Sequence, residues 1–426
     1  MEVIEITVGH QGAALTGTTN EIIQLAIDRV SSLGGGIVTL LPGKYAMHDS
    51  IHLRSNVVLR GSGTDTVLWK PPSVSSPVKG LNGYGLYAVA VDHPDKFDIG
   101  SGIFITDDLS NAFYDTVATV CWKDGNDLGL SKPLNHDISA RAKGTATTVY
   151  PIVCGYDVEN VRLEHFVIEG NASENKYIHG CRGGGVFFMR SKHIQMANLT
   201  VKDYNGDGIS FQQCINTHIE NCSCLNNAGI GLHPGSGSVG FVIRNSTFRG
   251  NKEDGIYYCL RVSYSSCENC IIENNGRDGL SIGHRDTDLI IRGNLVKGNG
   301  RYGVYLRNDA GGRSGDRVLI AHNEFQDNCA DSGNAELFFD AAAEDVRLIG
   351  NAFTAVERQR DSLFSGVYVN HPGCIGYIDG NRTSGYSLLS ADSATSLINF
   401  STALPEQALD VEHKPVPAGA MRHLNG

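Results

Sequence analysis

The 426-residue chain has few prolines, no long apolar run and no excess of positive charge. Only 12 prolines accompany 51 glycines, a balance that suits many turns between uninterrupted strands. Because no apolar stretch is long enough to span a bilayer, we expect no membrane partner. The formal net charge of −11 argues against nucleic acid as a partner and leaves carbohydrate open.

Residues 1–16 carry neither a basic region nor an apolar run, so the sequence shows no signal peptide. The 11 cysteines are odd in number and form no closely spaced framework, which favours free thiols. Cys267 and Cys270 have the spacing of a metal pair, but no second pair accompanies them, so we predict no metal site. We expect a cytoplasmic chain, or a mature exported chain that lacks its signal peptide.

An asparagine recurs inside short apolar runs along the second half of the chain. The eight positions are Asn198, Asn221, Asn245, Asn269, Asn294, Asn323, Asn351 and Asn381. Their spacings of 23, 24, 24, 25, 29, 28 and 30 residues are typical of a solenoid. Each repeat holds two or three strand-like runs and no helical pattern, which predicts an all-β parallel β-helix with coils about 4.8 Å apart. Since an amide both donates and accepts, we expect these asparagines to form a ladder.

A glycine precedes an alternating strand in five successive repeats, and counting from it predicts which side chains face outward. The glycines are Gly208, Gly229, Gly255, Gly279 and Gly303. One outward column reads Phe187, Ser210, Gly231, Tyr257, Ser281, Tyr305, Phe338 and Tyr368. The next reads Met189, Gln212, His233, Cys259, Gly283, Arg307, Asp340 and Asn370. Such aromatic and charged columns are unusual on a solvated sheet face, so we expect a sugar-binding groove; a face covered by a loop or a partner subunit is the alternative.

Carboxylates stand at the edge of this predicted sheet, just before the glycines. They are Asp207, Asp254 and Asp278, with Glu253 beside Asp254. Glycosidases use two carboxyl groups, about 5–5.5 Å apart for retention or about 6.5–9.5 Å for inversion. Coils about 5 Å apart bring Asp254 and Asp278 into that range, and their mutual repulsion raises the pKa of one. Because Asp-Gly is also a common turn pair, a purely structural role is the alternative.

Polar and aromatic side chains beside these acids are the predicted substrate-binding residues. They are Gln212, His233, Tyr257, His284, Arg285, Tyr305 and Arg307. An arginine or histidine that neutralises a uronate carboxylate acidifies the C5 proton, and Tyr257, His233 or Arg307 could then act as the base of a lyase or epimerase. Asp286 and Asp288 offer oxygen ligands that suit Ca²⁺, but we predict no obligatory cofactor.

The repeat pattern also divides the chain. Thr18 and Glu21 have capping-box spacing and open a predicted helix that covers the first coil. The rhythm breaks where antiparallel signals appear, as at the Asp124-Gly125 turn. We predict an N-terminal arm (1–17), a capping helix (18–36), first coils (37–74), a β-rich insert (75–148), the main β-helix (149–382) and a C-terminal tail (383–426).

The segments GGGIVTLLPGKY (34–45) and NVVLRGSG (56–63) resemble the entry to the pectate-lyase-like superfamily of right-handed β-helices. This resemblance implies action on polysaccharides by hydrolases, lyases or epimerases, or a phage tailspike role. The segments 205–208, 253–255 and 276–283 are in turn similar to motifs of the polygalacturonases, glycoside hydrolase family 28. Asp278 stands where that family has histidine, and an extra coil separates the first two motifs.

These patterns together predict a carbohydrate-active enzyme, in the first place a glycoside hydrolase. Asp254 and Asp278 would be the reacting pair, with Asp207 and Glu253 in support. A uronate lyase or C5-epimerase is the second hypothesis, and a non-catalytic glycan-binding or tailspike-like module is the third. Similar β-helices occur as monomers and as trimers, so we expect one of these two states.

Overall fold

The computed structural model describes residues 4–110, 112–309, 312–356, 364–391 and 400–401. Within these residues, one α-helix and a few 3₁₀ turns accompany strands that pair mostly in parallel. The chain is a right-handed parallel β-helix with an N-terminal capping helix and a small antiparallel insert, as the sequence predicts. None of the described helices combines the length and the apolar character that crossing a bilayer requires.

Two compact units can be distinguished by contacts along the chain. Unit 1 comprises Met1–Met189, Ala197–Ser210 and Asn226–Gly229, and unit 2 comprises Arg190–Met196, Phe211–Leu225 and Ile230–Gly426. Strand β22 (Ile209–Gln212) contains residues of both. Each unit is described by itself below.

The capping helix α1 (Asn20–Ser32) opens unit 1 and packs on β1 and β3. Its buried residues are Asn20, Ile23, Ala26, Ile27 and Val30, so one apolar stripe faces the first coil. The predicted cap at Thr18 is wrong by one residue: Thr19 is the N-cap, and its side chain makes no capping bond.

The coils of unit 1 contribute strands to three parallel sheets. The first contains, in spatial order, β2 (Leu15–Thr16), β1 (Glu5–Gly9), β3 (Gly36–Leu40), β6 (Val57–Arg60) and β17 (Glu159–Glu164). The second contains β4 (Gly43–Ala46), β7 (Thr66–Trp69), β18 (Val167–Glu169) and β21 (Thr200–Lys202). The third contains β5 (Ile51–His52), β16 (Val153–Tyr156) and β19 (Val186–Met189).

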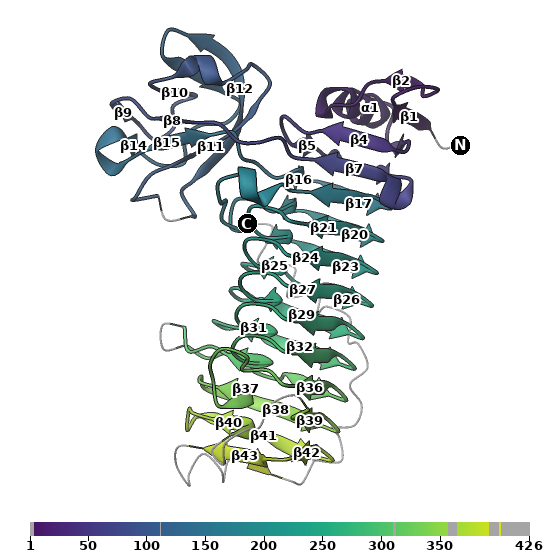
Figure 1. The fold of residues 1–426 in the computed structure, drawn as a ribbon, viewed down its shortest axis with the longest axis vertical. Coiled ribbons are helices and arrows are strands. Elements are labelled where there is room, and N and C mark those ends of the chain that lie inside the picture. The colour runs from purple at the N-terminus through teal and green to yellow at the C-terminus, as the bar shows by residue number, and fades with distance from the viewer. Residues whose placement is uncertain (1–3, 111, 310–311, 357–363, 392–399, 402–426) are drawn as a thin grey trace. The chain divides into compact units, whose positions relative to one another are not determined.

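An antiparallel insert interrupts these coils (Figure 1). Its six-stranded sheet runs β10 (Ala88–Ala90), β13 (Asp127–Leu130), β12 (Thr116–Asp124), β11 (Gly102–Thr106), β15 (Thr145–Thr147) and β8 (Ser75–Pro77). A second pair joins β9 (Leu81–Asn82) to β14 (Ile138–Ser139). The insert has a hydrophobic core of its own, which includes Val89, Phe97, Ile103 and Leu128.

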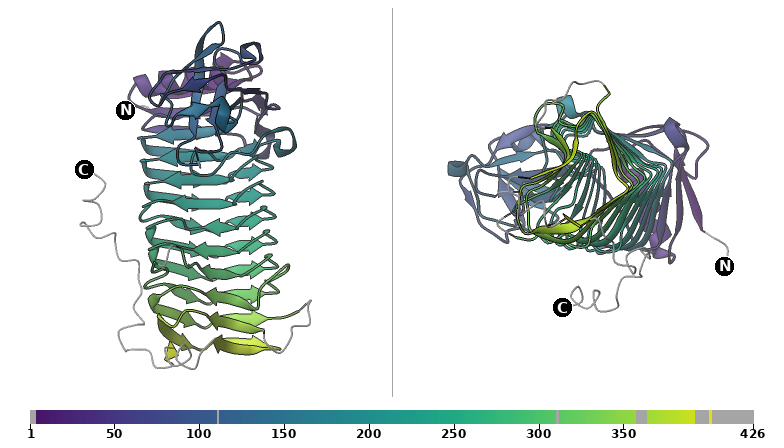
Figure 2. Two further views of the ribbon diagram at one scale, coloured as in Figure 1. Left: turned by 90° about the vertical axis from the view of Figure 1, so that its left-hand side faces the viewer. Right: turned by 90° about the horizontal axis from the view of Figure 1, so that it is seen from below.

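Unit 2 continues the same three-sheet pattern in stacked coils, which Figure 2 shows side on. One sheet contains β20 (Lys192–Ala197), β23 (Ile215–Glu220), β26 (Val242–Arg244), β29 (Ser263–Glu268), β32 (Thr287–Arg292), β35 (Leu319–Ala321), β38 (Ala343–Ile349), β41 (Cys374–Asp379) and β44 (Phe400–Ser401). Another contains β24 (Ser223–Leu225), β27 (Thr247–Arg249), β30 (Ile271–Glu273), β33 (Leu295–Lys297), β36 (Glu324–Gln326), β39 (Ala352–Thr354) and β42 (Arg382–Ser384).

The third sheet of unit 2 carries the predicted groove face. It contains β25 (Leu232–Gly235), β28 (Ile256–Tyr257), β31 (Leu280–Ile282), β34 (Val304–Leu306), β37 (Ala335–Phe339), β40 (Ser365–Val369) and β43 (Ser387–Ala391). Parallel pairing therefore extends to Ala391, beyond residue 382 where the repeat in the sequence fades. The rest of the predicted tail lies outside the described residues, apart from Phe400 and Ser401.

Inside the coils, equivalent side chains stack in apolar columns. One column reads Ile243, Cys267, Ile291, Ile320, Leu348 and Ile378. Cys267 is fully buried in this column, and all eleven cysteines of the chain are free thiols. Small soft thiols fill core positions here, as expected.

The predicted asparagine ladder is correct for its second half only. Asn294 donates to Asn323, Asn323 to Asn351 and Asn351 to Asn381, over 2.8–3.0 Å. The other four lie in the left-handed region at exposed turns instead: Asn198, Asn221, Asn245 and Asn269. Asparagine tolerates that conformation because its short side chain bonds locally, so the same residue type serves two different positions.

A second ladder runs along unit 2 and was not predicted. Asn251 donates to Asn275, Asn275 to Asn299 and Asn299 to Asn328, over 2.7–2.9 Å. The series ends where Asn328 donates to Glu336 over 2.6 Å. Each amide also binds backbone groups of adjacent coils, so these fully buried turns have their polar groups satisfied.

Candidate functional site

The candidate site lies on the outer face of the third sheet of unit 2. Register pairs Tyr257 with Ser281, Ser281 with Tyr305, Tyr305 with Phe338 and Phe338 with Tyr368, as the outward column predicts. Phe338 and Tyr368 stack with ring centroids 5.4 Å apart and planes at 1°. We call Tyr257, Tyr305, Phe338 and Tyr368 the aromatic ladder; all four side chains are half-buried.

The predicted register is wrong by two residues in one coil. Leu232 pairs with Ile256, which places His233, and not Gly231, beside Tyr257. Their rings meet edge to face with centroids 5.4 Å apart. The repeat NAGIGL contains two glycines, and the second one, Gly231, is the one that aligns with Gly255, as its hydrogen bond to the Asp254 carbonyl shows.

Arg307 is built into this face. Its guanidinium carbon lies 3.9 Å from the centroid of the Tyr257 ring, and the residue as a whole is 4% exposed. It donates to Asp309 Oδ2 (2.9 Å), Ser281 Oγ (3.0 Å) and the Tyr258 carbonyl (2.8 Å). A Cβ at Gly283 would stand 1.7 Å from the guanidinium, so this glycine makes room for the arginine.

Asp278 is fully buried and bound by a bidentate ion pair. Arg301 donates from Nε to Oδ1 (2.8 Å) and from Nη2 to Oδ2 (2.6 Å). The backbone N–H of Tyr302 and the Ser281 hydroxyl also donate to this carboxylate, over 3.2 Å each. These four hydrogen bonds fix the position of the Asp278 side chain.

Asp254, one coil away, has a very different environment. Its Oδ1 accepts from the backbone N–H of Asp278 (2.9 Å), while no donor among the described residues lies within reach of the buried Oδ2. Burial, and after it the negative charge of Asp278, raises the pKa of Asp254 to about 7. Both acids are closed to solvent. Glu253, the predicted supporting acid, is half-buried.

Arg301 links the acids to the aromatic ladder. Its guanidinium carbon lies 4.6 Å from the Tyr305 ring centroid, and the Tyr305 hydroxyl donates to Asp340 over 3.1 Å. Burial, with Asp340 adding to it, raises the pKa of Tyr305 to about 12. Sequence reasoning missed Arg301, although it stands in the repeat immediately after Asp278, where a partner for a buried acid is to be expected.

The remaining predicted site residues are distributed more widely. Asp207 is buried in unit 1, and Gln212 is buried in unit 2. His284 Nδ1 lies 3.1 Å from the carbonyl of Asp309, whereas Arg285 is exposed. The structure thus gathers His233, Tyr257, Arg307, Tyr305, Asp254 and Asp278 on one sheet and its edge.

The two acids considered for Ca²⁺ are bound by protein donors. Asp286 accepts from the backbone N–H groups of Val262 (2.9 Å) and Gly283 (2.8 Å), and burial raises its pKa to about 6. Asp288 forms an ion pair with Arg317 at 2.7 Å. That the chain needs no obligatory cofactor stays a prediction.

Comparison with known proteins identifies a family. The family model described as "Periplasmic copper-binding protein (NosD)" matches residues 138–355, which is 218 of 426 residues. None of the curated proteins searched matches this sequence.

Solved structures with the same fold include two epimerase modules from Azotobacter vinelandii. The mannuronan C-5 epimerase AlgE6 A-module is 15% identical with a TM-score of 0.60, over 87% of this chain and 84% of that chain. The AlgE4 A-module is 15% identical with a TM-score of 0.53, over 88% and 93%. A hyperthermoactive exopolygalacturonase from Thermotoga maritima is 13% identical with a TM-score of 0.51, over 87% of each chain. At these identities the likeness concerns the fold.

The family description raises the question of a copper site. Protein copper sites draw on imidazole and sulfur ligands in a defined geometry. In the part of the chain that the structure describes, no group of three or more His, Cys, Asp or Glu is arranged to hold a metal ion. The described residues therefore do not fit a copper site of that kind.

Proposed function

This chain belongs to the NosD family of right-handed β-helix proteins, and we propose that it is a carbohydrate-active enzyme. The proposed substrate is a poly- or oligosaccharide that lies along the aromatic ladder of unit 2. The observation that carries the proposal is this half-buried ladder, Tyr257 to Tyr368, next to two buried acids, of which Asp254 has a raised pKa and Asp278 is paired with Arg301. Relatives in fold act on mannuronan and on polygalacturonate, as their names state.

The ladder supports sugar binding through its geometry. Tyr305, Phe338 and Tyr368 stand on successive strands about 4.8 Å apart and form an apolar strip, and Ser281 separates Tyr257 from it. The C–H faces of pyranose rings are apolar and pack on aromatic faces. Asp340 and Asn370, hydrogen-bonded to each other over 2.6 Å beside the ladder, offer polar groups for sugar hydroxyls.

Glycoside hydrolysis is the reaction that we propose first. A glycosidase needs one carboxyl group that stays protonated and another that stays ionised. Asp254 fits the protonated member, because its pKa is raised to about 7. Asp278 fits the ionised member, because Arg301 binds it. Since both are buried, this reaction also requires that bound sugar displaces the side chains that cover them.

Uronate lyase or C5-epimerase chemistry is the second candidate, and a specific contact favours it. Tyr257 is half-buried and lies under Arg307, so a uronate bound here would have a cation and a phenol close to its C5 carbon. A cation that neutralises the carboxylate acidifies the C5 proton. Burial raises the pKa of Tyr257, however, so it fits proton donation better than proton removal.

A product screen distinguishes these reactions. The purified chain is incubated with a glycan panel that includes alginate and polygalacturonate, and reducing ends, ultraviolet absorbance and C5 configuration are followed together. New reducing ends without absorbance support hydrolysis, absorbance supports the lyase, and an inverted C5 supports the epimerase. Glycan binding without turnover would contradict the proposal that the chain is an enzyme and would favour a non-catalytic glycan-binding module.

Variants then assign the residues. Asp254→Asn should lower hydrolysis by at least about 100-fold, because it removes the proposed general acid. Tyr257→Phe should lower lyase or epimerase activity by at least about 100-fold, and it should leave the rate of hydrolysis within about threefold of wild type. Asp288→Asn is the matched control, since Asp288 forms a surface ion pair with Arg317 on another sheet of the same unit.

The location and assembly of the chain follow as further proposals. Because the family is described as periplasmic, we propose that the chain acts outside the cytoplasm, and the cytoplasmic alternative has no support. Fractionation of cells that express the full gene tests this directly. A monomer or a homotrimer stays the prediction for its oligomeric state.

A further inference from the structure

A cleft in unit 1 is lined by none of the candidate site residues considered so far. It has a volume of about 500 Å³ and is lined by strands of the coils and by the antiparallel insert. Its lining includes His52 on β5, Cys154 and Tyr156 on β16, Thr119 and Cys121 on β12, and Lys132 just after β13. Pockets of this size hold small organic molecules.

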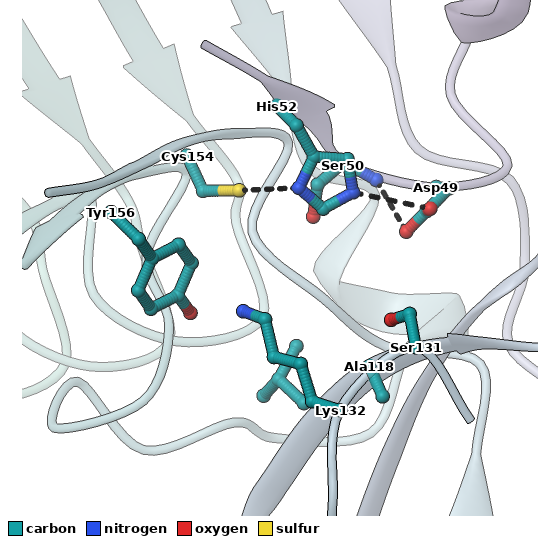
Figure 3. Close-up of a pocket in the computed structure, with 9 residues that line it drawn as sticks. Asp49, Ser50, His52, Ala118, Ser131, Lys132, Cys154 and Tyr156 are labelled. Carbon is teal, nitrogen blue, oxygen red and sulfur yellow. Dashed lines mark hydrogen bonds and ion pairs between the residues drawn. The ribbon is translucent and has the colours of Figure 1, made fainter. Parts of the chain in front are cut away.

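Three side chains in this cleft form a continuous relay (Figure 3). Cys154 pairs with His52 in parallel register, and its Sγ lies 3.3 Å from His52 Nδ1. The opposite ring nitrogen, Nε2, lies 3.4 Å from Asp49 Oδ2. A nucleophile, a base and a group that orients the base are the parts of a catalytic triad.

Asp49 is itself held in place. Its Oδ2 accepts from the Thr119 hydroxyl (2.6 Å), and its Oδ1 accepts from the backbone N–H of Ser50 (2.7 Å). The carboxylate is buried, whereas a third of the His52 side chain is exposed to the cleft. Thr119 belongs to the insert, so the insert helps to position Asp49. Because the relay and its support come from segments far apart in the chain, no short sequence motif predicts them.

The pKa of His52 is raised in this cleft. The charge of Cys154 is the largest cause that raises the pKa of His52 to about 10; burial opposes it, and Asp49 adds to it. Lys132 reaches into the same cleft, with its Nζ 3.5 Å from the Tyr156 ring centroid. An ammonium group there can stabilise negative charge that develops on a substrate oxygen.

We propose that Cys154 is the nucleophile of an acyl-transfer site, with His52 as its proton carrier and Asp49 as a positioning residue. The substrate class is a small carboxylic ester. The site goes beyond the carbohydrate reaction proposed for unit 2 and uses none of its residues.

The reaction balances with water as the only co-reactant. The thiol proton passes to His52 Nδ1, sulfur attacks the ester carbonyl, and the oxyanion forms on the Lys132 side of the cleft. The carbon–oxygen bond breaks as His52 protonates the leaving alkoxide, which gives an alcohol and an S-acyl cysteine. Water, deprotonated by His52, then releases the carboxylic acid and regenerates the thiol.

The histidine–aspartate relay favours an ester over a disulfide as the substrate. Thiol–disulfide exchange expels a thiolate, which leaves without protonation. An alkoxide leaves only when an acid protonates it, and His52 is placed to do so. The relay would be superfluous for exchange with a disulfide.

Cys121 provides a matched control within the same cleft. It is exposed, and its thiol contacts the Thr119 carbonyl at 3.5 Å, with no histidine among its hydrogen-bond partners in the structure described. If burial alone governed reactivity, iodoacetamide would alkylate Cys121 faster than the buried Cys154. We expect the reverse near neutral pH, and His52→Asn should slow alkylation of Cys154 by at least about tenfold while Cys121 is unchanged. Equal or slower alkylation of Cys154, insensitive to His52→Asn, overturns the proposal.

Acyl transfer itself is tested with p-nitrophenyl acetate. The full chain should release nitrophenol with an initial burst, and peptide mapping should find the acetyl group on Cys154. Cys121→Ser should retain the burst, and Cys154→Ser should abolish it with an unchanged melting temperature. Asp49→Asn should lower kcat while KM is unchanged, as positioning requires. A reactive Cys154 without an acyl adduct overturns the assignment of acyl transfer.

Discussion

At the scale of residues, Asp254 and Asp278 show how neighbours decide the chemistry of identical side chains. Both precede a glycine, both are fully buried, and they lie one coil apart. Arg301 pairs with Asp278, whereas among the described residues Asp254 has no ion-pair partner and accepts one backbone hydrogen bond. The sequence could predict that one of the pair would have a raised pKa, but not which one, because the partner comes from the next coil.

The raised pKa of Asp254 predicts a dependence of stability on pH. Its pKa rises from about 3.9 in the unfolded chain to about 7 in the folded chain. The group therefore stabilises the fold fully at acidic pH, and this contribution is lost as the pH rises through about 7. We therefore expect the difference in unfolding free energy between Asp254→Asn and wild type to shift in favour of the variant by about 2 kcal/mol from about pH 5 to about pH 8. Urea unfolding at the two pH values measures this difference.

A control keeps this experiment specific. Asp124→Asn changes an exposed acid at the hairpin turn of the insert and should shift the stability equally at both pH values. If Asp254→Asn behaves like Asp124→Asn, Asp254 is ionised in the fold at neutral pH. The split between the two acids, and with it the proposed hydrolytic pair, would then be wrong.

The buried ion pair gives a second prediction at this scale. Arg301→Met leaves the fully buried Asp278 without its cation and should cost about 3–5 kcal/mol of unfolding free energy. Arg317→Met breaks a similar Arg–Asp pair, with Asp288, in which both side chains are partly exposed, and should cost at most about 1 kcal/mol. Equal losses in chemical denaturation would show that burial does not govern these pairs.

At the scale of elements, each asparagine at a turn of the coils has one of two roles, depending on the partners of its side-chain amide. An asparagine in a ladder spans two coils, whereas one in the left-handed region serves its own turn. Adjacent residues can differ completely in this way: Asn275 is in the ladder and fully buried, and Asn274 has a φ of 55° and is exposed. The spacing of 23 to 30 residues cannot distinguish the two kinds of asparagine, because both kinds recur with every coil.

This difference predicts opposite outcomes for neighbouring substitutions. Asn275 donates to Asn299 and the Phe248 carbonyl and accepts from Asn251, so Asn275→Ala leaves several buried groups unpaired. We expect a loss of about 3 kcal/mol or more, measured by urea unfolding. Asn274→Gly keeps the left-handed turn available and should change stability by less than about 1 kcal/mol. Comparable losses for both variants would contradict the assignment of the ladder.

At the scale of the whole molecule, the insert is a separately packed element added to a repeating one. Val74 and Thr148 flank it and hydrogen-bond to each other twice, each over 2.9 Å. The chain therefore leaves and re-enters the coils at one point, and the insert has its own core. Solenoid stability depends on contacts between neighbouring coils, which do not include this core.

Replacement of residues 75–147 by a short Gly-Ser linker should therefore leave the β-helix folded. We expect a β-sheet circular dichroism spectrum and a cooperative thermal transition. The rapid alkylation of Cys154 should be lost, because Thr119 and Lys132 belong to the insert. An unfolded product would show that the insert stabilises the first coils, and unchanged alkylation would show that the cleft needs no residue from it.

The sequence by itself determined the repeating fold, the capping helix, the presence of an antiparallel insert and most of one outward column. These features depend on local sequence periodicity, which every coil repeats. They can therefore be predicted without knowledge of any tertiary contact. The structure alone decided the register at His233, the second asparagine ladder, Arg301 as the partner of Asp278, and the relay of Asp49, His52 and Cys154. Each of these joins residues from different coils: 23 residues separate Asp278 from Arg301, and 102 separate His52 from Cys154. Side-chain pairing across such distances follows from stacking in space, which a period in the sequence predicts only to within a residue or two.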